Sequence, residues 1–226
     1  MKNIQCIGFD ADDTLWQNEC FYLDAERHFR SLLLDDASED EISRIFFETE
    51  TKNMDCLGYG AKAMTMSMIE TAIAICPQIS SDKIQKIIDI GKTLLEVPTV
   101  MLPGVMETFR ALKKYRIVII TKGELNEQQR KFDHSPIDKE IPYFVLPDKK
   151  TSTYARLLAR ENIDPKTFLM IGNSPRSDVL PPLELGSWAA HVPFHTTWAH
   201  EDVELPEHPR LIQLNDIREI IRYLDI

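Results

Sequence analysis

The sequence predicts an α/β fold in which a doubly wound parallel sheet carries an inserted four-helix bundle. Two observations lead to this prediction. From about residue 105 onward, short strands that are apolar throughout alternate with helices, which is typical of a parallel sheet covered on both faces. Between residues 17 and 102, by contrast, the apolar residues recur only with helical spacing, and four such helices are enough for a small bundle.

The elements follow in order from local signals. A short apolar strand over residues 4–9 ends at Asp10. Helices are then predicted over residues 21–34, 38–53, 61–76 and 80–96, with Ser38 to Glu41 as a capping box for the second of them. In the last part of the chain we expect helices over residues 105–114, 124–134, 151–161 and 215–224, and strands over residues 116–121, 143–146, 167–171 and 187–192.

Composition and charge exclude several classes of protein. The chain has 226 residues, of which 43% are hydrophobic and 27% charged, and its formal net charge is −10. An acidic chain without a basic stripe is not expected to bind nucleic acid. No run of about 18 apolar residues indicates a membrane span, and the first residues do not resemble a secretion signal. No sequence feature indicates an oligomeric state.

The cysteines indicate a reducing compartment. Their spacing never gives the Cys-x-x-Cys pattern of a metal or redox site, so we expect free thiols and a cytoplasmic protein. The four are Cys6, Cys20, Cys56 and Cys76.

Polar residues gather where the predicted strands end. Ligands of doubly wound sheets bind at the carboxyl ends of the strands, so these residues are candidates for a site. They are Asp10, Asp12 and Asp13 after the first strand, Thr121, Lys122 and Gly123 after the second, Lys149 and Lys150 after the third, and Asn173 and Asp178 after the fourth. Three acids within four residues repel one another unless a cation lies among them. Oxygen ligands of this kind suit Mg²⁺.

These segments, in this order and at strand ends, resemble the four motifs of the haloacid dehalogenase (HAD) superfamily. The first is Asp10-x-Asp12-x-Thr14-Leu15, and the others are Thr121, a lysine after the third strand, and Gly172-Asn173 with Asp178. The resemblance covers essentially the whole chain and implies a HAD-like Rossmannoid core.

The resemblance also implies a role for each residue. Asp10 would be the nucleophile that becomes an aspartyl-phosphate, and Asp12 the general acid and base. Thr121 would bind the transferring phosphoryl group, with Lys122 and Gly123 beside it on the substrate. Lys149 would neutralise nucleophile and phosphate. Mg²⁺ would be held by Asp10, by the backbone carbonyl of Asp12, and by Asn173 and Asp178.

Elementary chemistry agrees with these residue types. A carboxylate attacks a phosphate dianion poorly unless a divalent ion and a lysine screen the repulsion. A second carboxyl two residues later lies on the same side of an extended backbone. It can protonate the leaving alkoxide and then deprotonate the attacking water.

An insert between the first and second motifs corresponds to the helical lid that the family calls a C1 cap. We therefore expect a core domain of residues 1–16 and 103–226 and a cap domain of residues 17–102. Gly58-Tyr59-Gly60 and Lys62 lie at the middle turn of the bundle, where such a cap usually reaches the active site. Tyr59 and Lys62 are therefore candidates for binding the leaving group of the substrate.

The resulting prediction is a Mg²⁺-dependent phosphatase acting on a small phosphorylated metabolite. Dehalogenases of the superfamily lack the second acid of the first motif, so Asp12 disfavours that activity. A mutase of the β-phosphoglucomutase type keeps both acids and stays open as an alternative, as does a non-catalytic protein that binds phosphometabolites. Asn173 departs from the family, in which many relatives have Asp at that position.

Two adjacent lysines compete for the role at the third strand end. Thr151 is expected to be the N-cap of the next helix, and relatives often place the functional lysine two residues before that cap. This selects Lys149, and Lys150 should then face solvent, because adjacent extended residues point to opposite sides.

Overall fold

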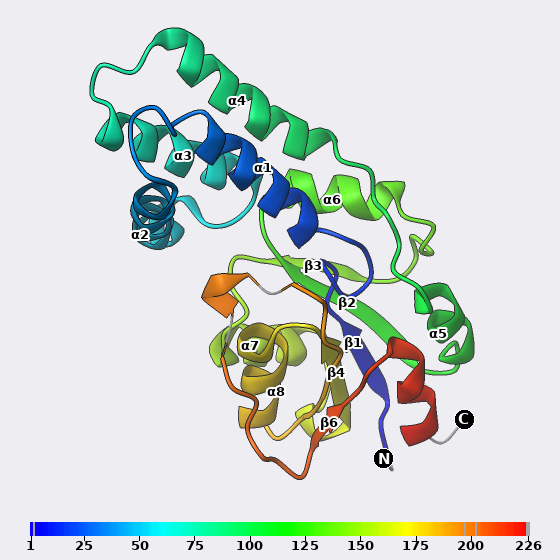
Figure 1. Ribbon diagram of the computed structural model, residues 1–226. Helices are drawn as coiled ribbons and strands as arrows, with labels where there is room; N and C mark the ends of the chain where they lie inside the picture. Colours follow the sequence, from blue (N-terminus) through cyan, green and yellow to red (C-terminus); the bar gives the residue numbers. More distant parts are fainter. Residues whose placement is uncertain (2, 197, 202, 225–226) are drawn as a thin grey trace. The chain divides into compact units, whose positions relative to one another are not determined.

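A computed structural model describes residues 1, 3–196, 198–201 and 203–224 of the chain (Figure 1). The chain forms two compact units. The first consists of Met1–Glu19, Thr99–Lys122 and Gln128–Ile226, and the second of Cys20–Pro98 and Gly123–Glu127.

The first unit is built on a six-stranded parallel sheet with the order β3-β2-β1-β4-β5-β6. Its strands are β1 (Cys6–Phe9), β2 (Arg116–Lys122), β3 (Tyr143–Leu146), β4 (Phe168–Gly172), β5 (Trp188–His191) and β6 (Leu211–Gln213). β1 lies between β2 and β4, with Phe9 aligned to Ile119 and Ile171. The strand order reverses between β1 and β4, and this is the place where doubly wound sheets bind ligands.

Helices cover both faces of the sheet, because successive strand residues point to opposite sides. Ile7 and Phe9 face one core, to which α5 (Val105–Ala111) and α6 (Leu125–His134) contribute. Cys6 faces the other, to which α7 (Thr151–Arg160) contributes. α8 (Leu180–Glu184) packs against β5 in a smaller cluster. The doubly wound α/β fold predicted from the sequence is therefore confirmed.

The second unit contains four helices around a shared apolar core. They are α1 (Glu19–Ser31), α2 (Glu39–Leu57), α3 (Ala61–Ile75) and α4 (Ser81–Glu96). The side chains of Ser38 and Ser80 cap α2 and α4 by accepting the backbone N–H three residues on. Phe29, Phe46 and Met68 lie in the core of this unit. We call it the helical unit below, and its role as a cap stays a prediction.

The C-terminal segment differs from the expected α-helix. Residues Ile217–Tyr223 form a 3₁₀ helix. The Asp216 carboxylate accepts the Arg218 N–H at 2.8 Å, and the Asp216 carbonyl accepts the Glu219 N–H at 3.0 Å. These short-range bonds favour the tighter i→i+3 pattern. β6 was also missed, since three residues are too few for an apolar period to show.

The predicted N-cap of α7 is wrong by one residue. The N-cap is Lys150, and no side chain bonds the first N–H groups of the helix there. The Thr151 hydroxyl donates to the carboxylate of Glu184 on α8, so it stabilises the packing of two helices rather than the start of one.

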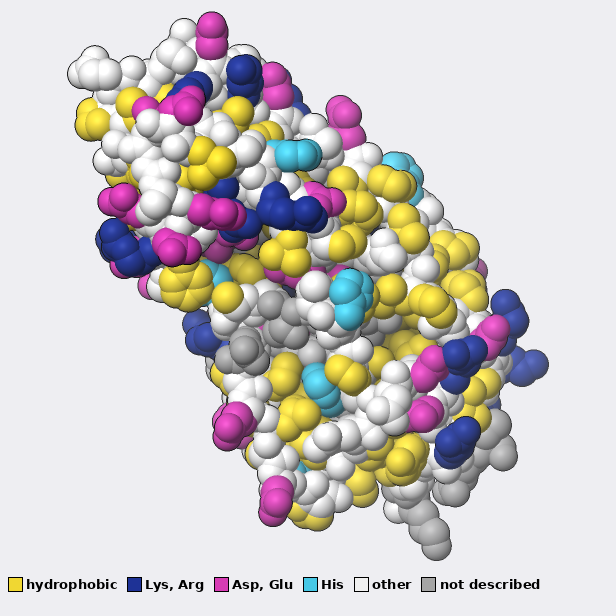
Figure 2. Space-filling model, in the orientation of Figure 1, with side chains coloured by type: hydrophobic (Ala, Val, Ile, Leu, Met, Phe, Trp, Pro, Cys, Tyr) yellow, Lys and Arg dark blue, Asp and Glu magenta, His cyan; other side chains and the backbone are white. Residues whose placement is uncertain are grey.

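The surface of the helical unit carries charges of both signs side by side. Arg27 pairs with Asp24, and Arg44 with Glu48, and Figure 2 shows basic and acidic side chains interspersed over this unit. No helix in the described part of the chain has the length and apolarity that crossing a membrane requires.

Candidate active site

The candidate nucleophile lies directly after the central strand of the sheet. Asp10 is 6% exposed, and its backbone N–H donates to the Ile171 carbonyl at 2.8 Å, which extends the pairing of β1 with β4 by one residue. The chain then turns sharply, because the N–H of Leu15 returns to the Ala11 carbonyl at 2.8 Å. This turn brings the acids of the first motif together at the carboxyl end of the sheet.

Lys149 joins the ends of three strands. Its Nζ lies 2.5 Å from Asp10 Oδ1 and 2.7 Å from Asp178 Oδ1. Its side chain is 1% exposed, whereas that of Lys150 is 75% exposed and pairs with Asp148. The structure therefore brings Lys149, not Lys150, to the two buried carboxylates.

The charges of this cluster do not balance. Burial, and next the charge of Asp178, raise the pKa of Asp10 to about 7, against the opposing effect of Lys149. Burial lowers the pKa of Lys149, but Asp10 and Asp178 together outweigh it and leave that pKa raised. One ammonium serves two buried carboxylates, so a further cation would stabilise their ionised forms.

Thr14 connects the first motif to the fourth. Its hydroxyl lies 2.9 Å from Asp10 Oδ2 and 3.2 Å from Asn173 Oδ1, and it accepts the Asn173 N–H at 3.0 Å. The hydroxyl has one proton, so it donates to only one of the two side chains at a time. The structure thus places Asn173 next to Asp10 through one shared hydroxyl.

Asp178 reaches the cluster because residue 172 has no side chain. A Cβ at Gly172 would overlap the Asp178 carboxylate. Asp178 lies in a π-helical turn, Pro175–Val179, and its Oδ2 accepts the Ser174 N–H at 3.1 Å. Single π-helical turns occur frequently at functional sites.

Asp12 is held by residues that the sequence analysis did not single out. Its carboxylate accepts from Trp16 Nε1 at 2.7 Å, from Gln128 Nε2 at 2.7 Å and from Lys131 Nζ at 3.1 and 3.2 Å. Gln128 and Lys131 lie three residues apart on α6. From their polarity alone, this face of the helix would be predicted to be exposed to solvent. Both are in fact buried.

Asp13 has a structural role. It adopts a positive φ of 60°, and its carboxylate accepts the N–H groups of Asn18 and Glu19 at 2.8 and 3.0 Å. It therefore satisfies the first N–H groups of α1. Burial, and next the charge of Asp12, raise the pKa of Asp13 to about 7, against these hydrogen bonds.

Thr121 and Lys122 end β2 beside the nucleophile. Thr121 is 1% exposed, and within the described part of the chain its hydroxyl donates one long hydrogen bond, of 3.4 Å, to the Lys122 carbonyl. Lys122, whose side chain is 19% exposed, forms an ion pair with the buried Glu201 and lies 3.2 Å from Ser177 Oγ. Burial, and next the charge of Lys149, lower the pKa of Lys122 to about 8. Glu201 was not foreseen, because it follows no strand.

The other predicted substrate contacts lie in the helical unit. Lys62 Nζ is 3.3 Å from Glu124 Oε2, and both residues belong to that unit. Gly123, with a φ of 145°, begins the segment that groups with it. The roles of Gly123, Tyr59 and Lys62 toward substrate stay predictions.

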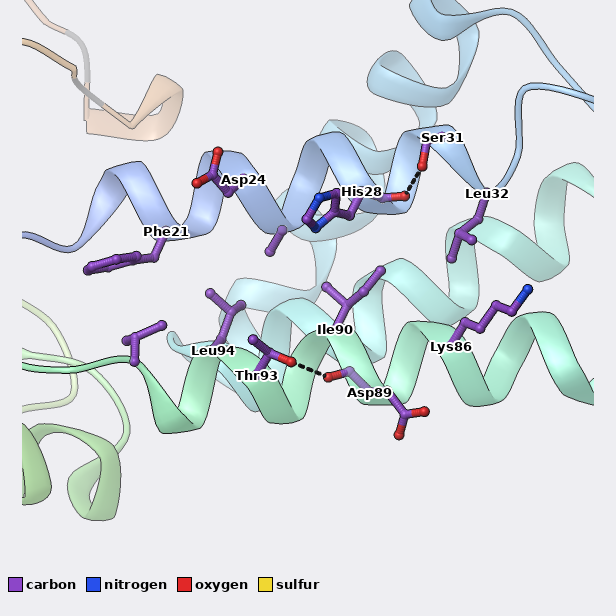
Figure 3. A pocket seen from close by; sticks show the side chains of 12 residues that line it. Phe21, Asp24, His28, Ser31, Leu32, Lys86, Asp89, Ile90, Thr93 and Leu94 are labelled. Carbon is purple, nitrogen blue, oxygen red and sulfur yellow. Dashed lines mark hydrogen bonds between the residues drawn. The ribbon is translucent and has the colours of Figure 1, made fainter.

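A groove of about 630 Å³ lies between α1 and α4 within the helical unit (Figure 3). Phe21 and His28 line it from α1, and Lys86, Ile90 and Leu94 line it from α4. None of the predicted site residues lines it.

The residues at the sheet edge fit a magnesium ion. Among the residues that the structure describes, no three His, Cys, Asp or Glu side chains converge as a metal cluster. Mg²⁺ does not need such a cluster, since it binds through one or two carboxylates and keeps several waters. Asp10 and Asp178 are two buried carboxylates with an excess of negative charge, and the Asn173 amide lies beside them.

The chain is similar to haloacid dehalogenase-like hydrolases in both sequence and fold. A model of haloacid dehalogenase-like hydrolases matches residues 4–186. A haloacid dehalogenase-like family hydrolase from Xanthomonas campestris is 36% identical, over 99% of this chain and 92% of that chain, with a TM-score of 0.88. No curated protein matches the chain.

Two less similar structures show the fold alone. A predicted phosphoglycolate phosphatase from Haemophilus somnus is 20% identical, over 99% of both chains, with a TM-score of 0.63. A 2-haloacid dehalogenase from Pseudomonas syringae pv. tomato is 16% identical, over 97% of both chains, with a TM-score of 0.64.

Proposed function

Because the chain belongs to the haloacid dehalogenase-like hydrolase family, we propose that it is a Mg²⁺-dependent phosphatase of a small phosphorylated metabolite. One observation carries the proposal. A second carboxylate, Asp12, follows Asp10 by two residues, and the buried ammonium of Lys149 pairs with Asp10. A dehalogenase has no leaving alkoxide to protonate, so it has no use for this second acid.

Asp10 is the nucleophile of the proposed reaction. One of its carboxylate oxygens forms a bond to phosphorus, and the bond from phosphorus to the ester oxygen of the substrate breaks. Lys149 lies within hydrogen-bond distance of Asp10. Its positive charge compensates the negative charge on the nucleophile and on the phosphoryl group. Phosphoryl transfer depends mainly on such positioning and charge compensation.

Asp12 moves the protons. It gives its proton to the departing ester oxygen in the first step. It then takes a proton from the water that attacks the aspartyl-phosphate, which releases inorganic phosphate and regenerates Asp10. Each step leaves Asp12 in the state that the next one requires.

Thr121 and Lys122 are the proposed contacts of the phosphoryl group on the β2 side. The Thr121 hydroxyl is buried at the end of the strand next to Asp10, and its hydrogen bond to the Lys122 carbonyl is long, at 3.4 Å. Lys122 adds an ammonium, whose charge Glu201 offsets in the absence of substrate.

Asp10, the backbone carbonyl of Asp12, Asn173 and Asp178 would hold the magnesium ion. The ion would supply positive charge that offsets the negative charge of the carboxylates and of the phosphoryl group. We expect the protein to act in the cytoplasm, in keeping with the free cysteines of the described chain.

Phosphate release from p-nitrophenyl phosphate, with Mg²⁺ and with EDTA, tests the proposal. We expect turnover with Mg²⁺ and none with EDTA. Halide release from a 2-haloacid is measured in parallel. Release of halide without phosphate would show a dehalogenase. Release of no halide from the 2-haloacid, and of no phosphate from a panel of phosphorylated metabolites, would favour the non-catalytic binding protein.

A further inference from the structure

The carboxylate of Asp12 is held by three donors, each in a defined place. Trp16 Nε1 donates to Oδ1 and Gln128 Nε2 to Oδ2, each at 2.7 Å, while the Lys131 ammonium lies 3.1 and 3.2 Å from the two oxygens. A carboxylate accepts about four hydrogen bonds, so these contacts occupy most of its capacity and fix the plane of the group.

The donors on α6 are themselves fixed. The Tyr143 hydroxyl lies 3.0 Å from the backbone carbonyl and 3.1 Å from Oε1 of Gln128, and its one proton serves only one of these acceptors at a time. Both contacts are compatible with an amide whose Nε2 donates to Asp12. The Tyr143 ring in turn stacks on Phe132 of the same helix, with centroids 4.4 Å apart and planes 5° apart. Gln128 is 3% exposed. Burial and the contact with Tyr143 therefore restrict the orientation of Gln128 in addition to its bond to Asp12.

Lys131 is a buried cation with two acceptors in the same loop. Besides Asp12, its Nζ lies 2.7 Å from Asn18 Oδ1, and its side chain is 6% exposed. A buried ammonium is costly unless it is paired, so Lys131 strongly favours the Asp12 position seen here. The Asp12 side chain keeps 21% exposure, which leaves one side of the carboxyl open to a reactant.

We propose that Gln128 and Lys131 are positioning residues that fix the Asp12 carboxyl for proton transfer to and from the reacting oxygens. The inference rests on the proposed function, since it assumes that Asp12 is the acid and base. Proton transfer requires the partner oxygen within about 2.6–3.2 Å, and an error of about 1 Å can cost on the order of 10²-fold in rate. The helix after β2, and not the loop of the first motif alone, thus sets this distance.

The test compares two substrates that need an acid to different extents. An alkyl phosphate has a poor leaving group that requires a proton, whereas p-nitrophenolate leaves without one. For Lys131→Met and Gln128→Leu, we expect kcat/KM to fall by about 10- to 100-fold for the alkyl ester. For the aryl ester we expect a fall of less than about 3-fold, since its departure needs little acid assistance.

Lys139→Met is the matched control. Lys139 Nζ contacts the backbone carbonyls of Phe132 and Ser135 at the C-terminal end of α6, so its loss loosens the helix without removing a donor to Asp12. It should affect both esters equally. Where Lys131→Met does not fold, Gln128→Leu carries the comparison, because it removes a neutral group.

Equal losses on both esters, or no loss on either, would overturn the positioning role. Asp12→Asn in the same assay separates this failure from that of the proposed function. If Asp12→Asn loses kcat/KM selectively on the alkyl ester and the α6 variants do not, Asp12 remains the acid and the positioning role of Gln128 and Lys131 is refuted. No selective loss in Asp12→Asn refutes Asp12 as the acid.

Discussion

Lys149 donates to Asp178 across the carboxyl end of the sheet, with Nζ and Oδ1 2.7 Å apart. The same ammonium contacts Asp10, so one lysine connects the strand-end segments that carry the nucleophile and the fourth motif. A cation in this buried place acts in a medium of low dielectric, where its charge has a far larger effect than in water.

The first prediction follows from this arrangement. Lys149→Ala should lower kcat/KM for p-nitrophenyl phosphate by about 10²-fold or more, which corresponds to about 3 kcal/mol of transition-state stabilisation. Lys150→Ala is the control, because its side chain is 75% exposed, and it should change the rate little. The reverse ranking would assign the role to Lys150.

The second prediction concerns the amide of the fourth motif. Asn173→Asp should lower the Mg²⁺ concentration at half-maximal activity by about fivefold, because an added charge near the ion is worth on the order of 1 kcal/mol. Asn162→Asp makes the same charge change in the turn that follows α7, before β4 begins, and should have no effect. An unchanged Mg²⁺ dependence in Asn173→Asp would show that residue 173 does not bind the ion.

The third prediction concerns the close approach of Gly172 and Asp178. In Gly172→Ala the new Cβ overlaps the carboxylate. Such overpacking costs about 1–3 kcal/mol and moves Asp178 away from Lys149. We expect a lower free energy of unfolding in urea together with a loss of phosphate release.

Gly186→Ala is the control for this substitution. It also introduces a methyl group at a glycine, but the nearest atom, Arg210 Nη1, is 3.8 Å away. Any destabilisation there comes from the positive φ of 78° and should leave activity unchanged. Wild-type activity in Gly172→Ala would show that the position of Asp178 is unimportant.

The fourth prediction concerns substrate recognition by the helical unit. If Tyr59 and Lys62 bind the leaving group, Tyr59→Phe and Lys62→Ala should lower kcat/KM for the natural substrate more than for p-nitrophenyl phosphate. Lys52→Ala, an exposed lysine on α2, serves as the control. Equal losses on both substrates would reject the role.

The site residues that the sequence predicts best are those that directly follow a strand. Parallel strands share one carboxyl edge, so residues that follow separate strands must converge there, and the structure places Lys149 in contact with both Asp10 and Asp178. Alternation of apolar strands and helices was likewise sufficient for the doubly wound sheet, because burial on both faces dictates that pattern.

Residues that reach the site from helix faces and late loops were missed for a physical reason. Gln128 and Lys131 have the spacing of a solvated helix face, and tertiary contacts with Asp12, Asn18 and Tyr143 bury them. Glu201 lies in a segment without periodicity. Thr151 was predicted to be an N-cap because its hydroxyl is a good acceptor, yet the hydroxyl donates a hydrogen bond to the carboxylate of Glu184, which is distant in sequence.

The central claim is that Asp10 is the nucleophile of a phosphatase, and phosphate release by Asp10→Asn tests it most directly. Asp216→Asn, which changes the same group outside the site, serves as the control and should have wild-type activity. We predict that Asp10→Asn folds but releases no phosphate from an ester that the wild-type protein hydrolyses with Mg²⁺, because an amide cannot form the aspartyl-phosphate. Turnover by Asp10→Asn at a rate close to that of the wild-type protein would contradict the account.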